Sequence, residues 1–254
     1  KLLWHVEFNG VKGGKADPRY FDYDLGDGGG FGNSEQEYYT AGKSNVAMDG
    51  AGHLVITAKK IPWSSSILDR CISCQFSSAR LKTDGKIGFR YGRLEARMKM
   101  PTGLGTWPAF WMLGSDISVN SWPACGEIDI LEAKGSAPTW AYGTAHGPGY
   151  SGGQGIGNVF MGSTPLANDY HTYAIEWTKN DIKWYVDNTM YHELTNLTTS
   201  PNTYVFNHEF FMILNLAMGG NFTGEIDPNL TLAKLSVDYI RYYSLNGAGK
   251  LIKH

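Results

Sequence analysis

Cysteine, long apolar runs and charge of one sign are all scarce in this chain of 254 residues. Three cysteines are too few for a scaffold held together by disulfides. No apolar run approaches the length of a membrane span, and no positively charged leader with an apolar core begins at Lys1. We therefore expect a soluble, already processed protein without a membrane partner.

The charge balance argues against a polyanionic partner. The formal net charge is only -2, and the lysines and arginines are scattered singly along the chain. Proteins that bind nucleic acid usually carry a concentrated basic patch or stripe. The sequence therefore predicts no nucleic-acid partner.

Helix-forming residues rarely occur in long runs, whereas turn and strand formers are abundant. Aromatic residues make up 13% of the chain, and there are 32 glycines. This balance is typical of short strands joined by many turns. Because no repeat, linker or charge run marks a boundary, we expect one all-β domain over residues 1–254.

Alternation of apolar and polar residues is the main periodic signal. From Arg93 to Met100, every second residue is apolar, as in a half-buried strand. Turn residues after Trp177 and after Val186 predict an antiparallel meander through this part of the chain. Further strands are expected at His53–Ala58, Tyr142–Ala145, Thr172–Trp177, Ile182–Val186, Phe210–Ala217 and Leu235–Tyr242.

So many short strands are expected to form a sandwich of two packed antiparallel sheets. If one sheet is curved, its concave face provides an open cleft for an extended polymer. The glycine-rich stretches Gly26–Gly32 and Gly147–Gly157 are then surface loops, and either the rims of that cleft or simple connections.

Two of the cysteines, Cys71 and Cys74, form a single CxxC motif. A zinc site would need a second pair, and a thioredoxin-type site should begin a helix, whereas this motif precedes a predicted strand. A local disulfide is the preferred interpretation. Cys125 is then unpaired and expected to be buried.

The most informative segment is Gly126-Glu127-Ile128-Asp129-Ile130-Leu131-Glu132, which places three carboxylates in an otherwise apolar strand. Buried like charges resist joint ionisation, so such a strand must expose, pair or use them. Glu127 and Asp129 share one face of a regular strand. Glu132 joins them only if an extra residue near Ile130 and Leu131 forms a β-bulge.

Two converging carboxyl groups are the catalytic device of retaining glycosidases. One carboxylate attacks the anomeric carbon, and the other carboxyl group protonates the leaving oxygen. We expect Glu127 and Glu132 to do this. The alternative is a solvent-facing acidic strand edge, which the apolar residues Ile128, Ile130 and Leu131 make less favourable.

The GEIDILE segment resembles the active-site signature of glycoside hydrolase family sixteen, the laminarinase and lichenase group. The resemblance implies a concanavalin-like β-jelly-roll sandwich, with Glu127 as nucleophile, Asp129 as its assistant and Glu132 as acid/base. It also covers, in order, Glu7-Phe8-Asn9-Gly10, Ser78-Ala79-Arg80, Trp107-Pro108-Ala109-Phe110-Trp111-Met112, Asn215-Leu216-Ala217-Met218-Gly219-Gly220 and Asp238-Tyr239-Ile240-Arg241.

The spacing within the motif resembles the laminarinase-like branch, which has two residues between the Asp and the second Glu. This implies a secreted, extracellular retaining endo-1,3-β-glucanase (laminarinase) that acts on β-1,3-glucan without an organic cofactor. The alternatives are a β-1,3-1,4-glucanase of the same family and a non-catalytic β-glucan-binding recognition protein. Agar or carrageenan cleavage is less favoured, and a monomer is the default.

Several residues outside the motif resemble positions that bind the sugar chain in this family. Flat aromatic faces stack on pyranose rings, although packing in the core is the alternative for any one tryptophan. His146 is placed to donate to a sugar hydroxyl or to the acid/base carboxylate, although a lone His is usually structural. The expected substrate-binding residues are Trp107, Trp111, Trp122, His146, Asn33 and Arg80, with Glu37 as a further polar cleft position.

The resemblance also implies a structural calcium ion far from the cleft. Its ligands would be Glu7, Asp238 and a backbone carbonyl around Gly52, and hard oxygen ligands suit calcium. Two departures from the family pattern bear on the subsites. Phe222 stands where many relatives have Trp, and Cys125 precedes the catalytic Gly126, where its thiol either tunes the pKa of Glu127 or fills space.

Overall fold

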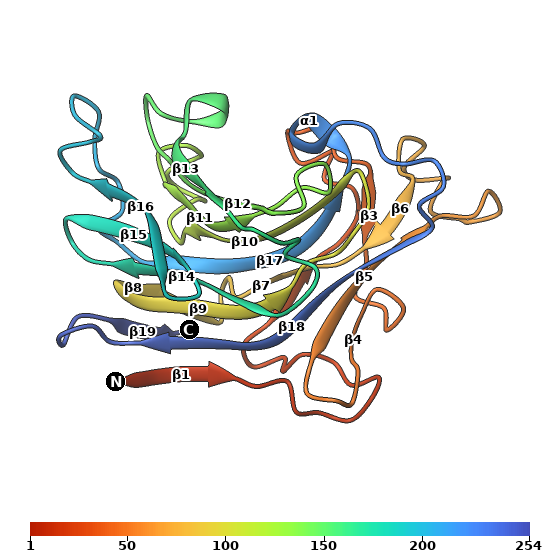
Figure 1. Ribbon diagram of the computed structural model, residues 1–254, viewed down its shortest axis with the longest axis horizontal. Coiled ribbons are helices and arrows are strands. Elements are labelled where there is room, and N and C mark those ends of the chain that lie inside the picture. Colours follow the sequence, from red (N-terminus) through yellow and green to blue (C-terminus); the bar gives the residue numbers. More distant parts are fainter.

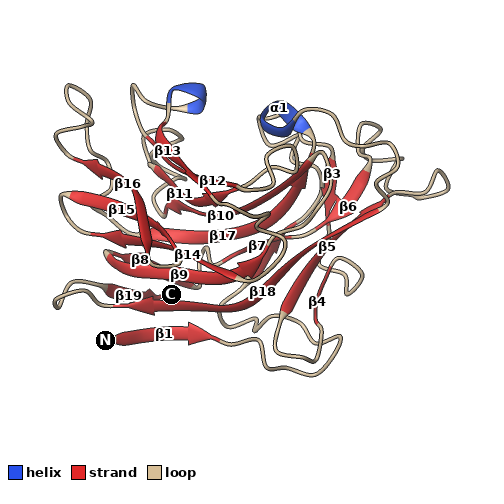
Figure 2. Cartoon of the chain, viewed as in Figure 1, coloured by secondary structure: helices blue, strands red, loops and turns tan.

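The computed structural model describes residues 1–254 as two stacked β-sheets with very little helix (Figures 1 and 2). The ten-stranded sheet contains β1 (Leu2–Val6), β3 (Glu37–Tyr39), β4 (Val46–Met48), β5 (Leu54–Lys60), β6 (Phe76–Ser78), β9 (Gly92–Lys99), β14 (His171–Trp177), β15 (Asp181–Val186), β16 (Thr189–Thr195) and β18 (Leu232–Tyr243). The nine-stranded sheet contains β2 (Asp22–Asp24), β7 (Arg80–Lys82), β8 (Ile87–Arg90), β10 (Thr106–Gly114), β11 (Glu127–Glu132), β12 (Trp140–His146), β13 (Ile156–Met161), β17 (Phe210–Met218) and β19 (Lys250–Lys253).

The pairing within the sheets is antiparallel except between β3 and β6. The nine-stranded sheet follows the order β13-β12-β11-β10-β17-β7-β2, so β11 is an inner strand between β12 and β10. The strands that meet in this sheet come from both halves of the sequence. The predicted sandwich of two antiparallel sheets is confirmed.

One apolar core of 46 buried residues fills the space between the sheets. Alternation along β9 explains how the strands reach it, because Leu94, Ala96 and Met98 are buried whereas Arg93 and Arg97 are more exposed. Burying each large apolar side chain stabilises the fold by about 2 kcal/mol. The two sheets are therefore held face to face mainly by apolar contact.

The predicted strands are all present, with bounds shifted by a few residues. The expected meander is formed by β14, β15 and β16, which pair in sequence. Several further strands were not predicted, most of them short. One of them, β13, begins at Ile156, inside the stretch predicted to be a loop, and forms the edge of the nine-stranded sheet. The rest of that loop contains the short 3-10 helix Gly152–Gln154.

The only α-helix, α1 (Gly220–Thr223), follows β17 and is a single turn (Figure 2). No helix in the structure has the length and apolar character needed to cross a lipid bilayer. The loop before β13 and the α1 segment rise on opposite sides of the nine-stranded sheet (Figure 1). They flank the face on which β11 lies.

The three cysteines behave as predicted. Cys71 and Cys74 form a disulfide within the loop between β5 and β6. Cys125 is a free, buried thiol that packs with Leu113, Phe211 and Ile213. Burial raises its pKa to about 11, so it is a neutral group that fills space beside the catalytic strand.

Candidate active site

A cleft of about 1060 Å³ lies over the nine-stranded sheet. Its floor is formed by side chains from β7, β17, β10, β11, β12 and β13, which cross it one after another. Loop residues 31–35 and 152–155 border it, so both glycine-rich stretches contribute to its rims. The residues predicted at the site that line this cleft are Glu127, Asp129, Glu132, Trp107, Trp111, Trp122, His146, Asn33 and Arg80.

A β-bulge in β11 brings the three carboxyl groups to the same face. In the pairing with β10, Phe110 is opposite Leu131 and Trp111 is opposite Asp129, so Ile130 has no partner. The pairing with β12 shifts at the same place. The extra residue restores the parity of Glu132, as the sequence predicted.

The strand begins after a glycine whose backbone only glycine adopts readily. Gly126 has φ +76, and a Cβ there would lie 3.0 Å from the Phe210 and Val205 side chains. From this point Ile128, Ile130 and Leu131 enter the core. Trp184, from the opposite sheet, donates from Nε1 to the carbonyl oxygen of Asp129 at 2.8 Å, which fixes the backbone next to the bulge.

The carboxyl groups are held in a poorly solvated environment. Burial first, and the neighbouring charge of Asp129 second, raise the pKa of Glu127 to about 8. Burial first, and the charge of Glu127 second, raise the pKa of Glu132 to about 7. The pKa of Asp129 is also raised, mainly by burial. The predicted rise for Glu132 is therefore found, but burial contributes more than the neighbouring charge.

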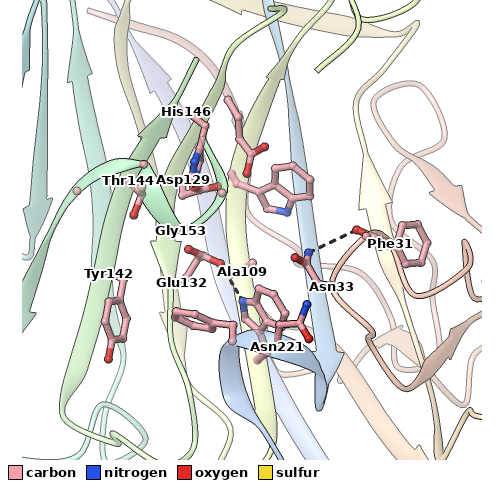
Figure 3. Close-up of a pocket in the computed structure, with 18 of the residues that line it drawn as sticks. Phe31, Asn33, Ala109, Asp129, Glu132, Tyr142, Thr144, His146, Gly153 and Asn221 are labelled. Carbon is pink, nitrogen blue, oxygen red and sulfur yellow. Dashed lines mark hydrogen bonds and ion pairs between the residues drawn. The ribbon is translucent and has the colours of Figure 1, made fainter. Parts of the chain in front are cut away.

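Two tryptophans hold the two glutamates. Trp107 donates from Nε1 to Glu132 Oε1 at 2.9 Å, and Trp122 donates from Nε1 to Glu127 Oε2 at 2.6 Å (Figure 3 shows the first of these bonds). Each bond uses the polar edge of an indole whose apolar body borders the cleft. These tryptophans therefore orient the carboxyl groups in addition to lining the site.

His146 lies beside Asp129 and not beside the predicted acid/base. Its Nε2 is 2.9 Å from Asp129 Oδ2, and the two side chains lie together in Figure 3. They come from adjacent strands, since Glu127 is opposite His146 and Asp129 is opposite Thr144. The predicted contact with Glu132 is not found, and contact with a sugar hydroxyl stays a prediction.

The other end of the cleft carries a stack around Arg80. Its guanidinium carbon lies 4.5 Å from the centroid of Phe31 and 4.9 Å from that of Trp111. Asp24 forms an ion pair with Arg80, with 2.9 Å between Arg80 Nε and Asp24 Oδ2. Trp111 in turn donates from Nε1 to Asn215 at 2.8 Å. Arg80 and Trp111 thus form one preorganised unit of the cleft wall.

Asn33 donates to Glu35 Oε1 at 3.2 Å, and both residues line the cleft. The interpretation of Glu37 as a cleft residue is wrong. Its side chain is fully buried and accepts a hydrogen bond from the Met218 backbone at 2.7 Å. Glu35 lies just before β3 and faces the cleft. Glu37, the first residue of β3, turns inward and accepts a hydrogen bond from the backbone at the end of β17.

Sequence reasoning missed several cleft residues. Asn215 is the one polar residue in the apolar strand β17, and a buried amide that needs partners could have revealed it. Glu35 was overlooked in favour of Glu37. The remainder, which become neighbours of the site only after folding, include Phe31, Tyr142, Thr144 and Asn221. Phe222, which the sequence analysis connected with a subsite, lines the cleft as well.

The segments predicted to bind calcium do meet. Val6 pairs with Ile240 next to Asp238, and a Cβ at Gly52 would lie 3.4 Å from Asn9 Oδ1. Both carboxylates, however, are neutralised by arginines: Glu7 by Arg241 at 2.8 Å and Asp238 by Arg97 at 2.5 Å. The two carboxylates that the predicted site would use are therefore already paired, and calcium binding stays a proposal.

Known proteins are similar to this chain in sequence and in fold. Residues 33–241 match the model of glycosyl hydrolases family 16. The chain is 40% identical to a beta-glucanase of Rhodothermus marinus, with 96% of this chain and 85% of that protein covered. It is 38% identical to glucan endo-1,3-beta-glucosidase A1 of Niallia circulans over 95% of this chain, although it spans only 37% of that protein's length.

A solved structure has a closely similar fold. The laminarinase catalytic domain of Thermotoga maritima superposes with a TM-score of 0.89 at 39% identity, covering 96% of this chain and 98% of that one. This likeness confirms the predicted jelly-roll sandwich. The chain belongs to glycosyl hydrolases family 16.

Proposed function

We propose that the chain is a retaining endo-1,3-β-glucanase that hydrolyses internal bonds of β-1,3-glucan. The observation that carries the proposal is the bulge at Ile130, which puts Glu127 and Glu132 on the same face of one strand inside an open cleft. Two carboxyl groups so placed suit double displacement. The names of the relatives support the substrate: a beta-glucanase in Rhodothermus marinus, a glucan endo-1,3-beta-glucosidase in Niallia circulans and a laminarinase in Thermotoga maritima.

In the first step, the carboxylate of Glu127 attacks the anomeric carbon while Glu132 donates its proton to the leaving glycosidic oxygen. The bond to the leaving sugar breaks and a glycosyl ester of Glu127 forms. In the second step Glu132, now ionised, takes a proton from water, and that water releases the sugar with its original configuration. Asp129 lies beside Glu127 and His146. A negative charge on Asp129 raises the pKa of Glu127, so the two carboxyl groups resist being ionised together.

An open cleft favours attack within a chain, because a polymer can extend past both ends. We further propose that the protein is secreted and monomeric. The Cys71–Cys74 bridge supports secretion, since disulfides persist in oxidising compartments.

The test is digestion of laminarin and of mixed-linkage β-1,3-1,4-glucan, with product sizes followed by chromatography and the first anomer by NMR. Internal cleavage of laminarin with initial release of the β-anomer supports the proposal. Preferred cleavage of the mixed-linkage polymer would indicate the alternative glucanase. Tight binding without cleavage would indicate a recognition protein instead.

A further inference from the structure

A row of aromatic side chains leads out of the cleft from the acid/base candidate to the surface. The centroids of Trp107 and Phe222 are 5.0 Å apart, those of Phe222 and Tyr142 are 5.2 Å apart, and those of Tyr142 and Trp140 are 6.2 Å apart. The first three residues line the cleft, whereas Trp140 lies beyond its lining. We call these four residues the aromatic row.

Strand geometry places Trp140 on the cleft face of β12. Tyr142, Thr144 and His146 line the cleft, whereas the intervening Ala141 and Ala145 are buried in the core. Because side chains alternate along a strand, Trp140 is the next member of the cleft-facing series. Trp140 is 38% exposed, so its ring is accessible to a ligand.

The neighbouring strand continues the same surface. Met161 on β13 is directly opposite Trp140 and is 66% exposed. Val159, two residues earlier on the same face, lines the cleft. Trp140 and Met161 therefore form an exposed apolar pair on the molecular surface, just beyond Tyr142 and Val159 at the end of the cleft floor.

A lysine supports the middle of the row. Lys134 Nζ lies 4.7 Å from the centroid of Phe222 and 5.1 Å from that of Tyr142. The ammonium group is attracted to the electron-rich ring faces and holds the two rings in a fixed arrangement. The row is thus preorganised, which lowers the entropy lost when a ligand binds.

We propose that Trp140, with Met161, forms a distal subsite that stacks on a pyranose ring of the glucan outside the cleft. The identity of the ligand rests on the proposed function. The spacing of the aromatic row is comparable to the size of a sugar ring, and aromatic faces suit the apolar face of a pyranose. The subsite is reached only by chains long enough to extend past Tyr142, so it selects for polymer length.

The experiment measures binding without turnover, in a Glu127→Gln background, by titration calorimetry with laminari-oligosaccharides of increasing length. Trp140→Ala weakens binding of the longer chains about fivefold and leaves that of the shortest ones unchanged. Trp140→Phe, which keeps a ring, restores most of the affinity. The matched control is Trp63→Ala, because Trp63 is 97% exposed in the loop between β5 and β6 and does not line the cleft.

An equal loss for short and long chains, no loss at all, or a loss matched by Trp63→Ala would overturn the distal subsite. So would a failure of the background protein to bind laminarin. The proposed hydrolysis is judged separately with Glu127 restored. A chain that binds with the predicted length dependence but cuts nothing would keep the subsite and reject the glucanase.

Discussion

At the scale of single residues, the site separates two glutamates by role although their surroundings are similar. Both are half-buried, both have a raised pKa and each accepts a hydrogen bond from an indole. Their position on the strand therefore assigns the roles, with Glu127 beside Asp129 and Glu132 beyond the bulge. Chemical rescue distinguishes the two roles directly.

Replacing either glutamate by alanine is expected to lower kcat at least a thousandfold, since a covalent or proton-transfer step is lost. With an activated aryl glucoside, azide then acts as a small external nucleophile. Glu127→Ala should yield the α-glycosyl azide, because azide takes the place of the enzyme carboxylate. Glu132→Ala should yield the β-azide, because azide attacks the covalent intermediate. Proton NMR identifies the anomer, and exchanged products would reverse the assignment.

The pH dependence of activity follows from the raised pKa values. The active form needs ionised Glu127 and protonated Glu132. Burial raises the pKa of Glu127 to about 8 and that of Glu132 to about 7, so the free site holds its one proton mainly on Glu127. The active arrangement is the minor form of the singly protonated pair, and its population follows the same pH profile as the pair. As a coupled pair they hold one proton best near neutral pH. We expect kcat/KM to be bell-shaped with its maximum near pH 7. A maximum near pH 4.5, the ordinary pKa of a glutamate side chain, would contradict this.

A second variant checks the same effect. The Trp122 N–H donates to the ionised form of Glu127 and so opposes the rise of its pKa. Trp122→Phe should therefore move the acidic limb of the profile to higher pH. Trp111→Phe serves as the control, because its N–H bonds Asn215 and not a catalytic carboxyl group.

Stability should depend on pH through the same groups. Because burial raises the pKa of Glu132 from 4.5 to about 7, the folded chain binds more protons than the unfolded chain between these values. Stability from this group is therefore lost as pH rises through that window. Glu132→Gln should raise Tm by about 5 °C above pH 7 and by nothing below pH 4.5. Differential scanning calorimetry across this range measures it, and a constant difference would contradict the coupling.

At the scale of elements, the catalytic strand shows how one unpaired residue sets the direction of a side chain. Because the side-chain period of a strand is two, removing Ile130 should leave a regular strand in which the second glutamate still faces the cleft. Inserting Ala after Ile128 should instead turn Glu132 toward the core. We expect the deletion to retain measurable activity, despite losing about 3 kcal/mol of stability, and the insertion to abolish activity.

Both chains would be compared by circular dichroism, to establish folding, and by laminarin hydrolysis. An inactive but folded deletion variant would mean that the bulge itself, and not only the direction of Glu132, is required. Equal activity of the two variants would mean that hydrolysis does not depend on whether the Glu132 side chain points into the cleft.

The elements also show what could be predicted from the sequence. Alternation and turn residues were enough to predict the longer strands and the meander, because these depend on local periodicity. The bulge was predicted from the parity of the three carboxylates, and most of the short strands were missed. Glu37 was misassigned because residues 33–37 are held by distant β17, and nothing in the local pattern distinguishes the inward carboxyl group from the outward one at Glu35. The aromatic row was missed because its members come from three separate segments.

At the scale of the whole molecule, the two terminal strands join different sheets, β1 the ten-stranded one and β19 the nine-stranded one, and neither lines the cleft. β1 pairs with β18, and both termini lie on the same side of the molecule (Figure 1). Glu7 and Arg241 link the same two segments through a bidentate ion pair. A calcium ion at the junction of Glu7, Gly52 and Asp238 would add to this link, and it stays a proposal.

Such an ion would bind the folded chain and not the unfolded one, so its removal should lower Tm in proportion to its occupancy. We expect excess EDTA to lower Tm by several degrees, and added Ca²⁺, but not Mg²⁺, to restore it, because Mg²⁺ demands a tighter octahedral site. Laminarin hydrolysis well below Tm should not change, since the site lies outside the cleft. An unchanged Tm would mean that the arginine pairs of Glu7 and Asp238 hold this region together without a metal.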